Sequence, residues 1–208
     1  HSLTDESRKP DIPGEVPSGL AVVSSLENES PELARFRPKL VKKKIPKLKK
    51  IGKKIYVSSG QTIQDGIDLA NPGDSVIIGP GVYHEMLAID KSSITIMGST
   101  KNRERHTVLD GLNVLSDAAV GSGNNIEIRD LIVKNYTSNG LMLNHARNVT
   151  YRNLECHNTG LYGIYPVECV GVLIENCLVT GSSDAAIYVG QSKDIIVRDN
   201  VAHGNVTG

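Results

Sequence analysis

The chain contains only three cysteines in 208 residues, Cys156, Cys169 and Cys177, and no C-x-x-C pair. Cysteine-based zinc sites use such closely spaced pairs, so their absence argues against a zinc site. An odd number of cysteines also cannot all pair within one chain. We therefore expect no metal ion and no cofactor.

The sequence also lacks a net charge and a long apolar run. Lys plus Arg number 23 and Asp plus Glu number 23, so no global charge attracts nucleic acid, and we expect none as a partner. No apolar run approaches the roughly 20 residues of a membrane span, so we expect no transmembrane segment. Aromatic residues are scarce, with seven Tyr, one Phe and no Trp. We expect a monomer.

The charges are unevenly distributed near the N-terminus. Residues 1–34 are acidic and polar, and they show no apolar period, which is typical of disorder. Residues 35–54, RFRPKLVKKKIPKLKKIGKK, contain no acid. We interpret residues 1–54 as a disordered tail that is first acidic and then polybasic.

The polybasic part of this tail has two interpretations. It is either a solvated linker or a patch that binds a polyanion, such as an acidic polysaccharide, a phospholipid surface or nucleic acid. The candidate residues for the second interpretation are Lys42, Lys43, Lys44, Lys47, Lys49 and Lys50.

The C-terminal part of the sequence repeats every 23 residues without insertion. The units begin at Asn124, Arg147, Val170 and Lys193, and a fixed period of this size indicates stacked repeats. Each unit opens with apolar residues in alternation, for example Ile126 and Ile128 in the first unit. Alternation predicts strands, and three short strands per unit predict one coil of a parallel β-helix. Leucine-rich repeats and propeller blades fit this pattern poorly.

The corners between the expected strands carry Asn, Asp or Gly, which tolerate a left-handed backbone. Two such columns recur at the 23-residue spacing: Asp130, Asn153, Asn176 and Asp199, and Asn135, Asn158, Gly181 and Gly204. Upstream, residues 62–70 predict a short amphipathic helix with Thr62 as its N-cap. Such a helix would cap the open end of the first coil.

Three further features have structural interpretations. Cys156 and Cys177 fall in apolar columns and would lie about 8 Å apart on successive coils, beyond disulfide reach. Residues 101–106, KNRERH, predict a charged protruding loop. We interpret the scattered histidines as turn or surface residues; they are His84, His106, His157 and His203.

The segment TIQDGIDLANPGDSVIIGPGVYHE resembles the opening of pectin-lyase-like right-handed β-helix proteins. The segment GLYGIYPVECVGVLIENCLVTGSSDAAIYVGQSKDIIVRDN resembles parallel β-helix repeat proteins of undefined activity. The resemblance covers residues 55–208. It implies an all-β fold, a right-handed single-stranded parallel β-helix with a short N-terminal capping helix. The last unit stops after 16 residues, so we expect this domain to be truncated at its C-terminus.

The resemblance leaves the activity open, because related β-helices include lyases, hydrolases, esterases, epimerases and binding proteins. Alginate C5-epimerases carry the motif Tyr-Gly-Phe-Asp-Pro-His-Asp, and the similar segment here is YGIYPVE, residues 162–168. The framework matches at Tyr162, Gly163 and Pro166. The acid position holds Tyr165 and the imidazole position holds Val167, which cannot transfer a proton.

One outward face nevertheless suggests a binding site. In the expected third strand, two residues of each coil point inward. These pairs are Leu141 and Leu143, Ile164 and Pro166, and Ile187 and Val189. Outward residues then stack from coil to coil: Met142, Tyr165 and Tyr188, followed by a column of His145, Glu168 and Gln191, with Asp184 at the start of the face. Flat apolar rings beside polar groups suit sugar rings and hydroxyls. The alternatives are a solvated ladder and catalysis by His145 and Glu168 as an acid/base pair.

The sequence therefore favours a protein that interacts with polysaccharide, neutral or acidic, and that is secreted or located in the cell envelope. The first alternative is a polysaccharide-modifying enzyme: a lyase, a glycoside hydrolase or a C5-epimerase. The second is a purely structural or adhesive repeat.

Overall fold

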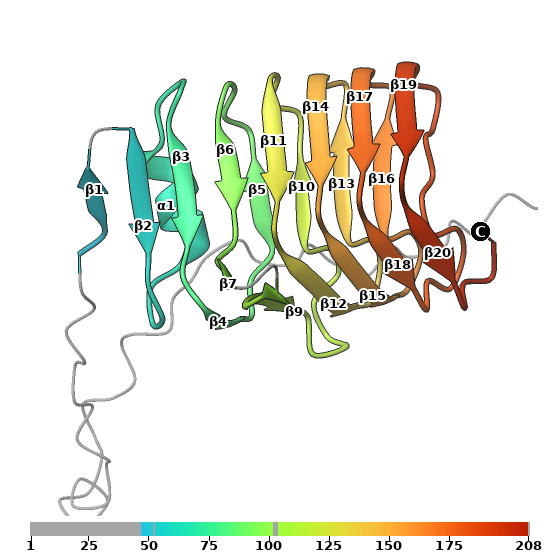
Figure 1. The fold of residues 1–208 in the computed structure, drawn as a ribbon, viewed down its shortest axis with the longest axis horizontal. Coiled ribbons are helices and arrows are strands. Elements are labelled where there is room, and N and C mark those ends of the chain that lie inside the picture. Colours follow the sequence, from blue (N-terminus) through green and yellow to red (C-terminus); the bar gives the residue numbers. More distant parts are fainter. Residues whose placement is uncertain (1–46, 52, 102–103, 208) are drawn as a thin grey trace, which may run out of the picture. The chain divides into compact units, whose positions relative to one another are not determined.

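The computed structural model describes residues 47–51, 53–101 and 104–207. These residues wind into a solenoid of parallel sheets (Figure 1). The expected tail, residues 1–46, and with it Lys42, Lys43 and Lys44, lies outside the described residues. Within the described part of the chain, the first strand starts at Lys49, ahead of the expected domain boundary at residue 55.

Three sheets form the walls of the solenoid. The first sheet contains β1 (Lys49–Ile51), β2 (Lys54–Val57), β3 (Ser75–Ile78), β6 (Thr95–Met97), β11 (Ile126–Arg129), β14 (Arg147–Arg152), β17 (Val170–Glu175) and β19 (Lys193–Arg198), side by side in that order. The second sheet contains β4 (Gly81–Tyr83), β9 (Thr107–Asp110), β12 (Ile132–Tyr136), β15 (Glu155–Thr159), β18 (Leu178–Thr180) and β20 (Val201–His203). The third sheet contains β5 (Leu87–Ile89), β10 (Ala119–Gly121), β13 (Leu141–Asn144) and β16 (Ile164–Val167).

The strand register confirms the predicted 23-residue coil. Ile126 pairs with Val149, Val149 with Val172, and Val172 with Ile195, all in parallel. The antiparallel pairs among the described residues are β1 with β2, and β7 (Thr100–Lys101) with β8 (Glu104–Arg105). The fold is therefore the expected parallel β-helix.

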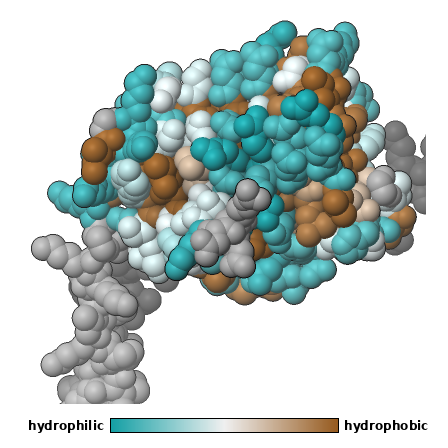
Figure 2. Space-filling model, viewed as in Figure 1, coloured by the Kyte–Doolittle hydropathy of each residue, from teal (hydrophilic) through white to brown (hydrophobic). Residues whose placement is uncertain are grey.

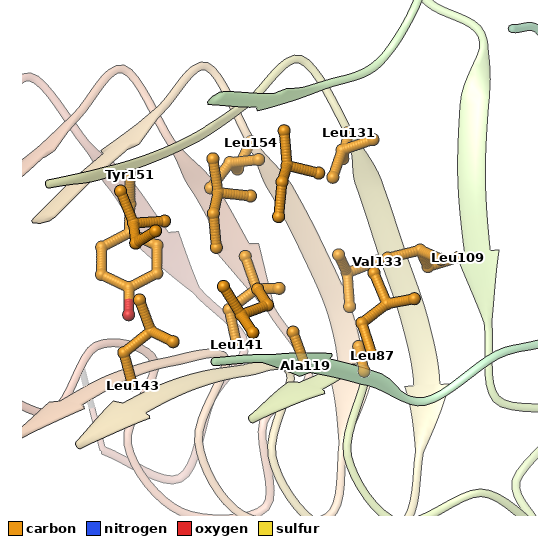
Figure 3. Close-up of a cluster of buried hydrophobic side chains, with 14 of the residues drawn as sticks. Leu87, Leu109, Ala119, Leu131, Val133, Leu141, Leu143, Tyr151 and Leu154 are labelled. Carbon is orange, nitrogen blue, oxygen red and sulfur yellow. The ribbon is translucent and has the colours of Figure 1, made fainter. Parts of the chain in front are cut away.

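Inward side chains from all three sheets fill the interior. Figure 3 shows Leu109 and Val133 of the second sheet, Leu87 and Leu141 of the third, and Tyr151 of the first around one core. Each of these side chains is at most 2% exposed. The core is mostly aliphatic, with Tyr136 and Tyr151 among its largest side chains. Successive coils lie only about 4.8 Å apart, which favours compact side chains that stack in columns.

Helix α1 (Ile63–Leu69) packs its buried Ile63, Gly66 and Ile67 over the first coil, as expected for a cap. The Thr62 side chain accepts a hydrogen bond from the Asp65 N–H at 3.3 Å. Thr62 has extended backbone angles, so it is the N-cap that the sequence predicted, and the helix proper begins at Ile63.

The corners adopt the predicted left-handed backbone in both Asn/Asp/Gly columns. Two further columns with positive φ were not predicted as corners: Asn125, Asn148, Gly171 and Asp194, and His145, Glu168 and Gln191. Side-chain amides bond from coil to coil, as between Asn148 Nδ2 and Asn125 Oδ1 at 2.9 Å. These side-chain bonds connect equivalent corners of successive coils.

The three cysteines are buried and unpaired with one another, as expected. Burial raises the pKa of the Cys177 thiol to about 11 and also raises the pKa of Cys156. A thiol with a raised pKa is a poor nucleophile at neutral pH, so these residues serve as small core side chains.

The predicted protruding loop at residues 101–106 is wrong in part. Arg105 of β8 folds back onto the second sheet, where its Nε donates to the Asn153 carbonyl at 2.7 Å and its Nη2 donates to Asn153 Oδ1 at 2.8 Å. The sequence pattern could not predict this contact, because it joins residues 48 positions apart, which is not a multiple of the coil period.

The last coil is less covered than the others. Ile196, Val197 and Val201 are 48–56% exposed, and hydrophobic residues gather on the side of Figure 2 where β19 and β20 lie. Val189, which we expected to point inward, is 39% exposed, because no further described coil packs over it. No helix among the described residues is long and apolar enough to cross a membrane.

Candidate binding face

The outer surface of the third sheet carries a column of mostly apolar side chains. Strand pairing aligns Ala88 with Val120, Val120 with Met142, and Met142 with Tyr165. The bridge between Ile164 and Ile187 extends this register, so Tyr188 follows Tyr165. The predicted outward stack is therefore present, and it continues toward the N-terminal end of the solenoid through Val120 and Ala88.

Three tyrosines meet at the C-terminal end of this column. The ring centroids of Tyr165 and Tyr188 are 5.3 Å apart and the rings are stacked. Tyr162 joins them from the corner before β16, with centroids 4.7 Å from Tyr165 and 4.9 Å from Tyr188. Such distances are typical of favourable aromatic contacts. We call Tyr162, Tyr165 and Tyr188 the tyrosine cluster.

Sequence reasoning missed the role of Tyr162. Alternation along β16 places Tyr165 outward, but it says nothing about a side chain on the preceding corner. The following residue, Gly163, faces the core instead, where a Cβ would lie 2.3 Å from Val179 Cγ1. The sequence therefore carried no signal that would have placed the Tyr162 ring against Tyr165 and Tyr188.

Asp184 lies beside the tyrosine cluster, as the sequence predicted. Its backbone N–H donates to the Leu161 carbonyl at 3.2 Å, which ties residue 184 to the corner that carries Tyr162. Partial burial, together with the negative charge of Asp184, raises the pKa of Tyr162 above its usual value of 10.0. The Tyr162 hydroxyl therefore stays protonated at neutral pH and can donate a hydrogen bond.

His145, Glu168 and Gln191 form the second predicted column, at the corner that follows the third sheet. All three have positive φ, between 45° and 53°. The His145 Nε2 contacts the Glu168 carboxylate, and the two side chains are 70% and 50% exposed. An imidazole and a carboxylate are thus in contact, but both are open to solvent, and the contact that each makes is with the other.

The charge around the tyrosine cluster is acidic. The segments that form this end of the face, residues 138–146, 160–169 and 183–192, contain Glu168 and Asp184 but no Lys or Arg. The only histidine in these segments is His145. This composition suits hydroxyl groups, which both donate to carboxylates and accept from protonated groups.

The described members of the predicted lysine cluster, Lys47, Lys49 and Lys50, lie elsewhere. Lys47 and Lys49 are exposed, whereas Lys50 Nζ bonds to Asp74 Oδ2 at 2.5 Å. This hydrogen bond, assisted by the Asn71 N–H, lowers the pKa of Asp74. Lys49 and Lys50 belong to β1, at the opposite end of the solenoid from β16 (Figure 1). The structure therefore does not bring the described lysines and the tyrosine cluster together.

A separate open groove of about 390 Å³ follows a corner of the first sheet. It is lined by polar residues that include Asp74, Thr95, Glu127, Asn148 and Thr150, and by no aromatic side chain. The described residues contain no group of three or more His, Cys, Asp or Glu that could bind a metal ion. This groove offers hydrogen bonds but no stacking surface.

The strand order and register define a parallel β-helix. Residues 81–208 match the family model of the right handed beta helix region, and the chain belongs to this family. No curated protein matches the chain.

Solved structures with a similar fold include two enzyme modules and a viral protein. The A-module of mannuronan C-5 epimerase AlgE4 from Azotobacter vinelandii superposes with a TM-score of 0.55 at 18% identity, over 70% of this chain and 53% of that one. The AlgE6 A-module from the same organism gives 0.50 at 18% identity, over 73% and 46%. ORF18 of Geobacillus virus E2 gives 0.56 at 16% identity, over 69% and 33%. The chain thus spans about half or less of these structures, and the likeness concerns the fold.

Proposed function

We propose that this protein binds polysaccharide across the outer surface of β13 and β16, with the tyrosine cluster as the main contact. The observation that carries this proposal is the meeting of three rings within 4.7–5.3 Å on an outward face. Tyr188 is 39% exposed, although an aromatic side chain gains free energy when it is removed from water. A sugar ring placed on the cluster supplies that burial.

The polar groups beside the tyrosine cluster would determine how a glycan chain lies on the face and which glycans bind. Asp184 lies at one side of the cluster, and Glu168 and Gln191 lie at the corner on the other side, so hydroxyl groups of a chain of sugars can bond at both ends. Because the local charge is acidic, we expect a neutral, hydroxyl-rich glycan in preference to a uronate polymer, whose carboxylates would meet Glu168 and Asp184.

The comparisons support a role with polysaccharide, because two of the similar structures are modules of mannuronan C-5 epimerases. A protein with this role works where polysaccharides occur, so we propose a secreted or cell-envelope location.

A polysaccharide-modifying enzyme is the second candidate, favoured by the contact between His145 and Glu168. In this mechanism one group removes a proton from the sugar and the other donates one. Glu168→Gln keeps the size and the hydrogen-bonding capacity of the side chain but removes the base. A binding protein should keep most of its affinity, whereas an acid/base enzyme should lose turnover by roughly a hundredfold or more.

Binding is tested by calorimetry with neutral and acidic oligosaccharides chosen from a glycan array. Tyr188→Ala should weaken binding by about 1 kcal/mol or more, roughly fivefold. It should leave the solenoid folded and lower the melting temperature only through the lost ring contacts with Tyr162 and Tyr165, because the ring does not fill the core. Tyr56→Ala is the matched control, since Tyr56 is a half-buried tyrosine of β2. If Tyr162→Ala and Tyr188→Ala bind every tested glycan as the parent does, and the parent shows no turnover, the face is a solvated ladder and the repeat is structural.

A further inference from the structure

A second cluster of polar side chains lies on the outer face of the second sheet, away from the tyrosine cluster. Thr180 Oγ1 lies 2.7 Å from His157 Nδ1, and His157 Nε2 lies 3.1 Å from Glu155 Oε2. The other oxygen of that carboxylate, Oε1, accepts a hydrogen bond from Arg105 Nη1. A hydroxyl, an imidazole, a carboxylate and a guanidinium are therefore linked in one line of hydrogen bonds.

The direction of every hydrogen bond in this line follows from its chemistry. A carboxylate can only accept, so the nitrogen of His157 that faces Glu155 must carry the proton. In the neutral imidazole the opposite nitrogen, Nδ1, is then an acceptor. When His157 is neutral, the Thr180 hydroxyl therefore donates to Nδ1, which is the arrangement that activates a hydroxyl nucleophile.

The carboxylate is held in place from a distant part of the chain. Arg105 reaches Glu155 from the β7–β8 hairpin and is fixed there by its two bonds to Asn153. The side chains of Arg105, Glu155 and His157 are only 14%, 24% and 26% exposed. The His145–Glu168 pair differs in both respects, because it is largely exposed and has no such anchor.

We propose that Thr180, His157 and Glu155 form a nucleophile–base–carboxylate triad that hydrolyses small acyl esters. Thr180 Oγ1 attacks the acyl carbon as its proton moves to His157 Nδ1. The bond between the acyl carbon and the alcohol oxygen breaks, and that oxygen takes the proton from Nδ1. Solvent water then attacks the acyl-threonine and gives its proton to Nδ1. Release of the acid returns that proton to Thr180, which restores the starting state.

The surroundings define the class of substrate. Strand pairing places His203 next to Thr180, on the side opposite His157, and His203 is exposed, so an imidazole N–H is available on the open side for the oxyanion. Glu155, His157 and Thr180 are not among the residues that line the 390 Å³ groove. A site on an outer sheet face suits a small acyl group such as acetyl on a large alcohol. One exposed donor favours esters over amides, because esters have the better leaving group.

The test uses p-nitrophenyl acetate as the probe. The release of nitrophenol measures the rate of hydrolysis. Mass spectrometry of peptides from acid-quenched protein identifies the residue that carries the acyl group. The parent should carry an acetyl group on Thr180. Thr180→Ala and His157→Gln should each lower kcat/KM by roughly a hundredfold or more, whereas Thr180→Ser should retain turnover. Glu155→Gln presents an amide donor to Nε2 and reverses the favoured tautomer, so kcat should fall while KM stays.

Two matched variants control for general surface chemistry. Thr150→Ala removes an outward threonine of the first sheet, and His84→Gln removes an exposed imidazole whose Nδ1 contacts the Asp110 backbone carbonyl at 2.8 Å. Both variants should keep the parent rate. Circular dichroism and melting temperature check the fold of each variant. The proposal is overturned if the parent forms no acyl adduct, if the adduct lies on another residue, or if Thr180→Ala hydrolyses the probe as the parent does.

Discussion

Gly163 should be one of the least replaceable residues of the solenoid, although its φ lies outside the left-handed region. A Cβ at this position would lie 2.3 Å from Val179 Cγ1 and 2.9 Å from the Ala186 carbonyl oxygen. Both neighbours are held in place, because Val179 is fully buried and Ala186 O accepts the Gly163 N–H at 3.0 Å. Gly163→Ala must therefore displace either the core or the neighbouring coil.

The magnitude follows from two opposing effects. Overpacking of a dense core costs about 1–3 kcal/mol, and the smaller backbone entropy of the unfolded alanine chain returns about 0.4–1 kcal/mol. We expect a net loss of about 1–2 kcal/mol. Val179→Ala alone should cost about 2 kcal/mol through lost burial and a small cavity. In the double variant, the new methyl group occupies space that Val179 vacated. The loss of stability in the double variant should therefore be smaller than the sum of the two single losses by at least about 1 kcal/mol.

The measurement is denaturant unfolding of the parent, both single variants and the double variant. Gly79→Ala is the matched control, because its Cβ would meet only the Val57 carbonyl oxygen, at 3.2 Å, and one carbon at 3.9 Å, and it should cost less than Gly163→Ala. The reasoning fails if Gly163→Ala lies within 0.5 kcal/mol of the parent, which is the range of ordinary surface substitutions, or if the two single costs simply add.

Two further predictions concern charge. Arg198 donates to the Glu175 carboxylate at 2.8 and 2.6 Å, and this bond, with Arg152 nearby, lowers the pKa of Glu175 below its usual 4.5. The stability that this carboxylate contributes is present above pH 4.5 and is lost as the pH falls further. When the pH is lowered from 4.5, the melting temperature of Glu175→Gln should therefore decrease less than that of the parent. If the polybasic stretch at residues 35–54 binds a polyanion, retention on heparin or alginate columns should fall steeply with salt, because exposed charges are screened within about 8 Å at physiological ionic strength, and salt-independent retention would contradict this.

The repeat period predicts much of the fold because stacking turns a fixed spacing into a contact. Residues 23 positions apart, such as Val149 and Val172, must occupy the same place on successive coils. Alternation then decides which of them face the core. Fold, coil length, register, capping helix and two corner columns follow from these rules. The same rules place Tyr165 beside Tyr188.

The period does not predict contacts that depart from it. Tyr162 reaches the tyrosine cluster from a corner, where alternation no longer defines direction. Arg105 reaches Glu155 from a hairpin, 50 residues earlier in the chain. His157 was interpreted as a surface residue because sequence alone shows its column but not its hydrogen bonds. The missed residues are therefore those whose position depends on side-chain conformation or on an excursion from the coil.

The two proposed sites are built from the same two coils but on different walls. The unit that begins at Arg147 supplies Glu155 and His157 to the second sheet and Tyr165 to the third, and the unit that begins at Val170 supplies Thr180 and Tyr188. Outward substitutions on one wall leave the shared core intact, so each site can be removed without the other. A core substitution such as Val179→Ala lies between the two walls, and it should disturb glycan binding and ester hydrolysis together. Loss of both activities in a core variant, with loss of one in each outer variant, is the pattern that two sites on one solenoid require.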